Sequence, residues 1–302
     1  MKKFLLKLAL FSVIISIIIL YILNKYSGYV DYFYGKVSSP SQSSLIIGDS
    51  RSFQGIQPRV IDSALSKKYE LPILNFSFTV KQMSYGDAWL KTIKKKVSPS
   101  TKNGLFVLSV HPWVLSERDE DDFKNGKFYE EDLPPNNLHF VNLNPNVEYF
   151  FKNYEYFHFK AMIKKISTVH SDGWLEENNI TTDSSMLAQW RKTQIGLYAK
   201  FSKSWKKSSY RVEKLNEIVS FLKQHGRVVL VRMPVSKEIS AIETKYWNNF
   251  DQEIKSLANK QSINYFTYSK AHDYYLYDGL HLNKQNGKKF TKTLCDSINK
   301  YR

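Results

Sequence analysis

The stretch Leu45-Ile46-Ile47-Gly48-Asp49-Ser50-Arg51-Ser52 joins a short apolar run to a polar loop. Three apolar residues that end at a glycine are typical of a buried strand, and Gly48 permits a tight turn there. Ser50 would then lie near a helix N-terminus, where outward-pointing backbone N–H groups stabilise negative charge. A serine in this position is placed to attack a carbonyl carbon, although Gly-Asp-Ser alone is also a common turn and capping sequence.

Further apolar runs alternate with helical patterns on both sides of a central interruption. We expect strands at 45–47, 72–76, 105–110, 227–233 and 263–267, and helices at 58–68, 82–96, 210–225, 245–260 and 284–300. Continuous apolar strands that alternate with helices predict a parallel sheet covered on both faces. The simplest topology is a three-layer α/β/α, flavodoxin-like fold with strand order 2-1-3-4-5 and a site beyond the carboxyl ends of the strands.

The alternation stops between about 114 and 208, where the chain is polar, aromatic and irregular. Helical stretches near 147–167 and 184–200 predict an inserted, partly helical cap. We expect one folded domain over residues 44–302 that carries this insertion. Residues 26–43 would be an interfacial aromatic stretch followed by a short serine-rich, flexible linker.

The first 25 residues predict a membrane anchor. Lys2, Lys3 and Lys7 precede an apolar run over 8–23, which with its flanks reaches the roughly 20 residues that span a bilayer. The exit of the run lacks the small residues of a signal-peptide cleavage site, which favours an uncleaved anchor. By the positive-inside rule the N-terminus is cytoplasmic, so the C-terminal domain is expected in the periplasm or outside the cell.

Composition limits the partners. The net charge is +16, and a basic exported surface suits lipid headgroups, phosphate-rich wall polymers or acidic polysaccharides, although excess lysine also simply improves solubility. Nucleic acid is not expected, because the location is extracytoplasmic and no basic run has nucleic-acid motif spacing. The single cysteine, Cys295, excludes a disulfide framework. No cofactor or metal is expected, because four histidines that were considered as ligands lack ligand spacing: His139, His158, His170 and His225.

A second loop supplies complementary chemistry. Tyr277-Asp278-Gly279-Leu280-His281 lies beyond the fifth expected strand and directly before the last helix. A catalytic histidine needs a carboxylate that fixes its tautomer, and this three-residue separation lets one loop supply both groups. Two loops at strand ends with matching chemistry are not expected by chance. Ser50, Asp278 and His281 are therefore the predicted catalytic residues.

Gly48-Asp49-Ser50 and Asp278-Gly279-Leu280-His281 resemble the first and last blocks of the SGNH/GDSL hydrolase superfamily. The resemblance implies that Ser50 is the nucleophile, His281 the general base and Asp278 its orienting partner. It covers the whole expected exported domain in block order, with specific matches at these two end blocks.

The middle blocks differ from the family pattern. The family has a glycine after the second strand and an asparagine after the third, which complete the oxyanion hole. Here Ser77 and His111 stand near those positions, so we expect oxyanion donors from the Ser77 backbone N–H and the His111 ring. Loss of one such donor costs on the order of a hundredfold in rate. Asn75 and Arg51 complete the candidate oxyanion and substrate-binding residues, and Arg51 would either bind a substrate anion or pair with a nearby acid such as Asp49.

Further segments resemble membrane-anchored SGNH-like proteins of bacterial envelopes, namely Arg51, Gly55-Ile56-Gln57-Pro58, 109–113 and Arg232-Met233-Pro234. Similar domains occur in teichoic acid D-alanylation and in polysaccharide O-acetylation. The resemblance implies a serine-dependent acyl esterase or O-acyltransferase that acts on a cell-envelope glycan or wall polymer, beside a multi-spanning O-acyltransferase partner.

Two other functions remain open. Because of Ser77 and His111, the chain could be a non-catalytic accessory or carbohydrate-binding module. The anchor and the basic surface also fit a lipid-active esterase. Four tryptophans would either line a sugar-binding groove or fill the cap's own core: Trp113, Trp174, Trp190 and Trp205.

Overall fold

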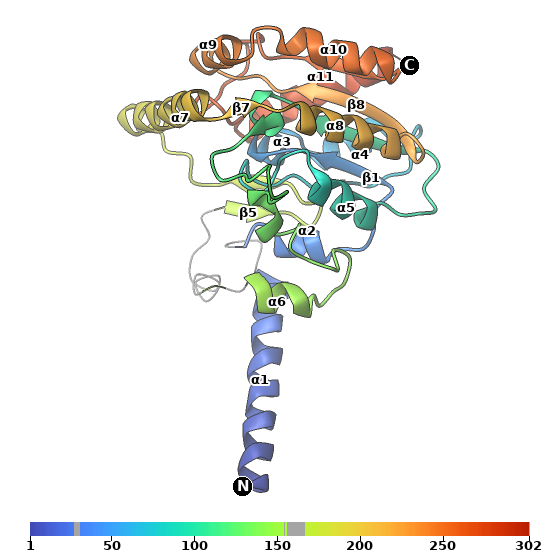
Figure 1. Cartoon of the computed structure of the whole chain (residues 1–302), viewed down its shortest axis with the longest axis vertical. Coiled ribbons are helices and arrows are strands. Elements are labelled where there is room, and N and C mark those ends of the chain that lie inside the picture. The colour runs from blue at the N-terminus through green and yellow to red at the C-terminus, as the bar shows by residue number, and fades with distance from the viewer. Residues whose placement is uncertain (27–30, 154, 156–166, 302) are drawn as a thin grey trace.

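The computed structural model describes the chain except for residues 27–30, 154, 156–166 and 302 (Figure 1). His158, most of the helical stretch expected at 147–167 and part of the aromatic stretch after the anchor therefore lie outside the described residues. At the two ends of that stretch, which are described, the helix is confirmed at the start only. Residues 147–153 are helical, whereas Ser167 begins a strand.

A parallel sheet of five strands forms the centre of the domain. Its strands are β1 (Ser44–Ile47), β2 (Ile73–Asn75), β3 (Gly104–Ser109), β8 (Gly226–Arg232) and β9 (Asn264–Thr267), in the order β2-β1-β3-β8-β9. This is the predicted order 2-1-3-4-5, so the topology is confirmed. All residues of β1, β2 and β3 are buried, as expected for central strands that are covered on both faces.

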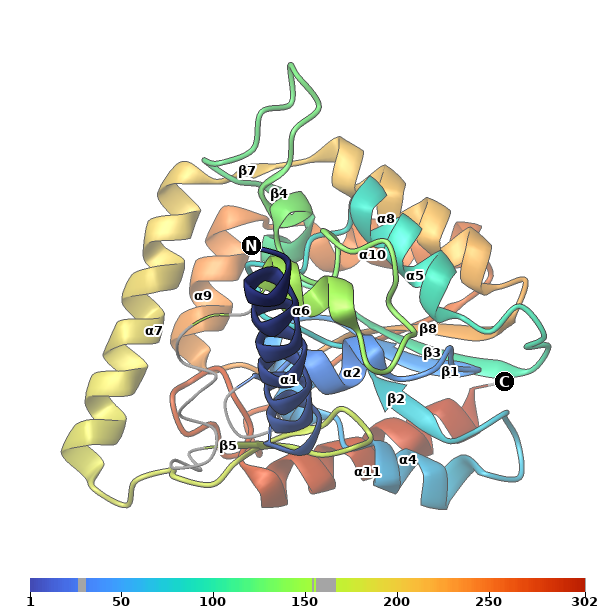
Figure 2. The ribbon, with the colours of Figure 1, turned by 90° about the horizontal axis from the view of Figure 1, so that it is seen from below.

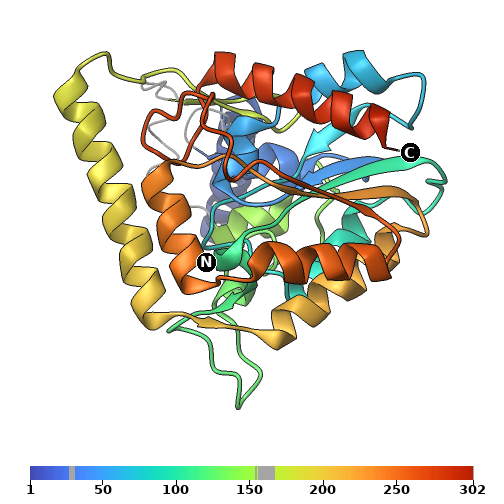
Figure 3. The ribbon, with the colours of Figure 1, turned by 90° about the horizontal axis from the view of Figure 1, so that it is seen from above.

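Helices cover the two faces of the sheet and make the predicted three layers (Figure 3). Alternate strand residues point to opposite faces, so Leu45 and Ile47 join one core cluster and Ile46 joins the other. The first cluster includes residues of α5 (Asp87–Lys96), α8 (Ser209–Leu222) and α10 (Phe250–Lys260). The second includes residues of α4 (Pro58–Leu65) and α11 (Lys284–Lys300), and α11 also contacts α3 (Ser50–Gly55).

Two helices depart from the sequence-based expectation. The single helix predicted over 245–260 is wrong: the region holds the end of α9 (Lys237–Tyr246) and the whole of α10. Ser236 starts α9 earlier than expected, because its side chain accepts the N–H of Ile239. Trp247 then ends α9, since its backbone leaves the helical region and its ring is buried. The helix predicted from residue 82 begins at Asp87, because a turn at residues 80–82 is followed by irregular backbone up to residue 86.

The segment that interrupts the alternation leaves and rejoins the domain at one place, where β4 (Ser116–Glu117) pairs antiparallel with β7 (Lys206–Lys207). Within it lie the short helices η3 (Tyr129–Asp132) and α6 (Val147–Asn153), the hairpin of β5 (Ser167–Val169) and β6 (Leu175–Glu177), and α7 (Ser184–Ser204). The segment is spread around the domain: α7 and α6 lie on different sides (Figure 1). Leu138, Val141 and Tyr149 even belong to the main core cluster.

An N-terminal helix, α1 (Lys2–Tyr26), projects away from the domain (Figures 1 and 2). Its stretch Lys2–Ile22 is long and apolar enough to cross a membrane, a test that a signal sequence also passes. The flexible linker expected in the second part of residues 26–43 is wrong at its start. Residues Tyr34–Ser38 form the short helix α2, and Tyr34 and Val37 are buried because they pack in the main core.

Candidate active site

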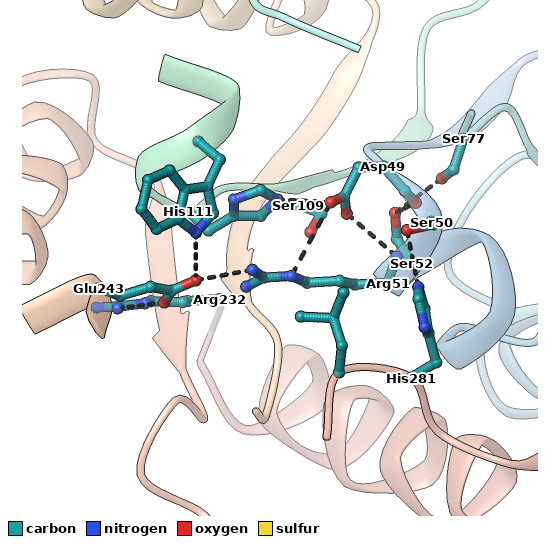
Figure 4. Close-up of polar contacts among 12 residues, drawn as sticks. Asp49, Ser50, Arg51, Ser52, Ser77, Ser109, His111, Arg232, Glu243 and His281 are labelled. Carbon is teal, nitrogen blue, oxygen red and sulfur yellow. Dashed lines mark hydrogen bonds and ion pairs between the residues drawn. The ribbon is translucent and has the colours of Figure 1, made fainter. Parts of the chain in front are cut away.

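The loop after β1 places Ser50 at the first residue of α3 (Figure 4). A Cβ on Gly48 would lie 2.3 Å from Ser52 Oγ and 2.5 Å from Ser109 Cβ, so only glycine fits at this strand end. The side chain of Asp49 caps α3, since its Oδ1 accepts the N–H of Arg51 at 3.2 Å. Ser50 is partly exposed beside these buried neighbours.

Ser50, His281 and Asp278 form a hydrogen-bonded chain across segments more than 220 residues apart. Ser50 Oγ lies 2.8 Å from His281 Nε2, and His281 Nδ1 lies 2.7 Å from Asp278 Oδ2. These contacts are consistent with an Nδ1–H that donates to the carboxylate and an Nε2 that accepts from the serine. The carboxylate and the imidazole are largely buried. The three residues predicted to be catalytic are thus brought together.

The loop between β9 and α11 holds the histidine and its carboxylate in place. Asp278 Oδ1 accepts the N–H groups of Leu280 at 2.9 Å and His281 at 2.8 Å. Gly279 adopts a φ of +86°, which favours glycine, and its carbonyl accepts the N–H of Ser236. Burial raises the pKa of Asp278, but the charge of His281 and these hydrogen bonds outweigh it, so the pKa lies below its usual value. The carboxylate is therefore ionised at neutral pH.

Aromatic side chains border this chain of contacts. The Tyr277 ring lies over His281, with centroids 5.9 Å apart and an interplanar angle of 25°, and its hydroxyl donates to Gln54 Oε1 at 2.7 Å. Trp190 of α7 approaches Tyr277 edge-on at 6.2 Å. The other three tryptophans are buried rather than exposed to a groove: Trp113, Trp174 and Trp205. Trp113 and Trp205 pack in one core cluster, as the core-packing alternative predicts.

His111 belongs to a second, separate aspartate–histidine pair. Its Nε2 lies 2.9 Å from Asp49 Oδ2, and its Nδ1 is buried without a hydrogen-bond partner. Burial and the charge of Arg51 lower the pKa of His111, although Asp49 opposes this, so the ring is neutral at neutral pH. A neutral ring that gives its one N–H to Asp49 has no proton left for an oxyanion. The expectation that His111 is an oxyanion donor is therefore wrong in this geometry.

Ser77 and Asn75 support α3 from behind. The backbone N–H of Ser77 donates to Asn75 Oδ1 at 3.1 Å, and Asn75 Nδ2 donates to the carbonyls of Ser52 and Ile56, each at 2.9 Å. Both side chains are fully buried. The expected oxyanion role of the Ser77 N–H and the expected substrate contact of Asn75 are therefore wrong, because these groups are already paired with each other and with the helix.

Arg51 pairs with acids inside the protein. Its side chain is completely buried, and its guanidinium lies 2.7 Å from Glu243 and 3.9 Å from Asp49. Of the two expectations for Arg51, the ion pair is the one the structure shows, and substrate binding is wrong because burial prevents it. Glu243 of α9 also accepts from Trp113 at 3.0 Å and from Arg232 at 2.8 Å (Figure 4).

Three residues of the site escaped the sequence reasoning. Glu243 lay outside every expected element, so nothing pointed to it. Lys36 lay in the expected linker, yet its ammonium is buried and donates to the Ser77 carbonyl at 2.6 Å. Gln54 had a usable signal, because it lies one helical turn after Ser50, which was expected near a helix N-terminus.

No protein-family model and no curated protein sequence matches the chain. Among solved structures, the chain is similar to Est24, a carbohydrate acetylesterase from Sinorhizobium meliloti, with 9% identity over 86% of this chain and 99% of that one and a TM-score of 0.43. A lipase/acylhydrolase from Enterococcus faecalis shows 10% identity over 84% and 94%, with a TM-score of 0.40. The M. smegmatis aryl esterase shows 8% identity over 87% and 100%, with a TM-score of 0.37. Likenesses this weak carry no argument about the reaction.

Proposed function

We propose that the chain is a serine-dependent acyl esterase or O-acyltransferase with Ser50 as its nucleophile. One observation carries the proposal: the hydroxyl of the partly exposed Ser50 lies 2.8 Å from an imidazole whose other nitrogen is held by a buried carboxylate. This is the arrangement that activates a hydroxyl for attack on an ester. The resemblance of the two end blocks to the SGNH superfamily points to the same chemistry.

The reaction would proceed in two halves. Ser50 Oγ attacks the ester carbonyl carbon while His281 Nε2 takes its proton, and the tetrahedral oxyanion then collapses. His281 gives the proton to the departing alcohol, which leaves an acyl group on Ser50. His281 next deprotonates water or a sugar hydroxyl, which attacks the acyl carbonyl, and Ser50 regains its proton. Water as acceptor makes the chain an esterase, and a sugar makes it a transferase.

Stabilisation of the oxyanion would fall mainly to the backbone. The first N–H groups of a helix have no intrahelical acceptor, so the N–H of Ser50 at the start of α3 is a donor of this kind. Because the Ser77 N–H and the His111 ring are paired elsewhere, fewer donors remain than in the family pattern. We expect a slow enzyme for this reason.

Three features support an envelope glycan or wall polymer as the substrate. The apolar α1 would anchor the domain at the membrane, outside the cytoplasm, and the charge of +16 suits anionic polymers. A groove starts at Asn283, two residues after His281, and its lining mixes polar groups with the exposed ring of Tyr275, as sugar-binding surfaces do. The other lining residues include Glu176, Glu177, Asn178, Thr181 and Gln285. A membrane-bound acyltransferase would supply the acyl group on the transferase route.

The test is covalent labelling of the full chain in detergent with a fluorophosphonate probe. We expect one adduct per chain, localised to Ser50 by mass spectrometry. Ser50→Ala should abolish labelling, and His281→Ala should slow it by on the order of a hundredfold or more, because the general base is lost. Equal labelling of the native chain and Ser50→Ala would refute the nucleophile.

The second candidate is a non-catalytic accessory module, and the pairing of the two expected oxyanion donors favours it. This candidate predicts no adduct at Ser50 in the experiment above. It also predicts that Ser50→Ala restores polymer acylation in cells from which the gene has been deleted, whereas the catalytic proposal predicts no restoration.

A further inference from the structure

Four large apolar side chains are exposed on one short segment of the domain. They are Phe140 at 53%, Leu143 at 47%, Val147 at 48% and Phe151 at 76% of their full exposure. Outside residues 1–26, the described part of the chain exposes only four other large apolar side chains, and these are scattered: Met186, Leu197, Tyr275 and Tyr301. Concentrated apolar surface of this kind marks a contact with a partner or a membrane.

The helix α6 carries apolar side chains on its outward side as well as on its inward side. On α6, the inward-facing Tyr149 donates its hydroxyl to both carboxylate oxygens of Asp31 at 2.8 Å, whereas Val147 and Phe151, one turn apart, face outward. The chain before α6 is fixed as well, since Glu148 accepts the N–H groups of His139 and Phe140. The exposed apolar side chains are therefore presented by a backbone that is held in place.

The segment lies at the outer end of the apolar helix α1. Ile19, which is within the stretch that could span a membrane, packs against the core cluster that contains Tyr149. Asp31, the partner of Tyr149, follows α1 by only five residues. Figure 1 shows α6 at the level along the long axis where α1 meets the domain. If α1 crosses the membrane, Ile19 lies in or near the lipid. The part of the domain that packs against Ile19 then lies at the membrane boundary.

We propose that residues 140–151 form a second membrane contact, in which Phe140, Leu143, Val147 and Phe151 enter the outer lipid interface beside α1. The inference rests on the anchoring by α1 proposed above. Burial of these side chains in lipid removes apolar surface from water, as in interfacial amphipathic helices. A single helix leaves a domain free to rotate about the helix axis, whereas two contacts hold the domain and its site in one orientation.

The experiment measures the depth of nitroxide labels on the full chain in lipid nanodiscs that contain one chain each. Single cysteines are introduced by Leu143→Cys and Phe151→Cys in a Cys295→Ala background, which removes the native thiol. Leu197→Cys on α7 is the matched control, since it is also apolar and exposed but distant from α1. Ile15→Cys reports on the anchor itself. Electron paramagnetic resonance then compares collisions with oxygen, which enters lipid, and with a water-soluble nickel chelate.

We expect the labels at 143, 151 and 15 to show a higher ratio of oxygen to nickel collisions than the label at 197. Labels at 143 and 151 that match the control at 197, with lipid values at 15, would overturn the second contact and leave the anchor standing. An aqueous value at 15 would overturn the anchor and the second contact together. Shielding of 143 and 151 from both reagents would mean that protein covers the segment, which also overturns the proposal.

Discussion

Two buried aspartate–histidine pairs flank the loop that carries Ser50, and their connections separate their roles. The hydrogen bonds of Asp278 and His281 lead to the Ser50 hydroxyl, so a proton can move from Ser50 to the imidazole. In the second pair, Asp49 contacts Arg51, and His111 Nδ1 is buried without a hydrogen-bond partner. No proton path to Ser50 therefore passes through this pair. The first pair is suited to catalysis, and the second holds the loop.

Asp278→Asn tests the role of the first pair. An amide in this position is not anionic, so it no longer favours the tautomer with a proton on Nδ1 and a free Nε2. We expect the rate of Ser50 acylation to fall by about a thousandfold or more, with the fold retained. The rate of fluorophosphonate labelling measures the loss, and near-ultraviolet circular dichroism checks the fold.

Asp273→Asn is the matched control for this substitution. Asp273 lies in the same loop but is exposed and pairs with Lys289 at 3.2 Å, so it should leave the labelling rate unchanged. Equal rates for the native chain and Asp278→Asn would show that the carboxylate does not orient His281.

At the scale of single residues, the sequence predicted which groups meet but not how the neighbouring groups are paired. Ser50, Asp278 and His281 were predictable because a short local motif marks the nucleophile in one loop and the histidine with its carboxylate in the other. The pairing of the Ser77 N–H was not, because it depends on how the backbone turns between Asn75 and Ser77. The contact of Lys36 with the Ser77 carbonyl joins residues 41 positions apart, which no local pattern reveals.

At the scale of elements, the last helix was predicted and the boundary between α9 and α10 was not. The last helix was predicted over 284–300 and begins there, because Asn283 caps it by accepting the N–H of Asn286. The boundary between α9 and α10 is set by burial of the Trp247 ring rather than by a proline or glycine. Tertiary packing of this kind leaves no break in the sequence pattern, so one helix was expected where two exist.

The last turn of α5 supplies a cation that joins three segments. The Lys96 ammonium is buried and donates to the carbonyls of Lys36 at 2.7 Å and Val141 at 2.8 Å, and also contacts the carbonyl and hydroxyl of Ser39. These oxygen atoms are buried or partly buried. Each buried acceptor that is left without a hydrogen-bond donor would cost about 1–3 kcal/mol of stability. This one side chain therefore ties α2 and Val141 of the insertion to α5.

Lys96→Met tests this tie. The substitution keeps most of the side-chain volume but removes every donor, so we expect a loss of about 3 kcal/mol or more in the free energy of unfolding. Lys91→Met, at an exposed position on the same helix, should change stability by less than about 0.5 kcal/mol. Denaturant unfolding in detergent measures both, and equal stability of the two variants would show that the buried ammonium is dispensable.

At the scale of the whole molecule, the sheet was predictable and the path of the insertion was not. Strand order follows from local apolar runs and the preference for short crossovers. The insertion is held by ion pairs between distant residues instead: Arg211 of α8 lies 2.6 Å from both Asp121 and Glu130, which are 90 and 81 positions away. Charges spread along the sequence do not reveal such partners in advance.

The same use of buried charge makes the stability of the molecule depend on pH. Burial raises the pKa of Glu243, but the charges of Arg51 and Arg232 outweigh it and lower the pKa to about 2, against an ordinary value of 4.5. The unfolded chain therefore binds a proton at Glu243 more readily than the folded one. This contribution to stability is present above about pH 4.5 and is lost as the pH falls toward about 2.

Glu243→Gln tests this contribution through the pH dependence of thermal unfolding. At neutral pH the variant leaves two buried guanidinium groups without their shared carboxylate, and we expect a loss of about 3–5 kcal/mol. The difference from the native chain should narrow as the pH is lowered from about 7 to about 3, because Glu243 of the unfolded native chain then binds a proton and the contribution of the carboxylate to stability is partly lost. Glu238→Gln is the control on the same helix, since its pair with Arg191 is exposed and contributes at most about 1 kcal/mol. Melting temperatures of the three chains in detergent across this range decide the matter, since parallel curves for the native chain and Glu243→Gln would show that Glu243 is not the acid-sensitive group.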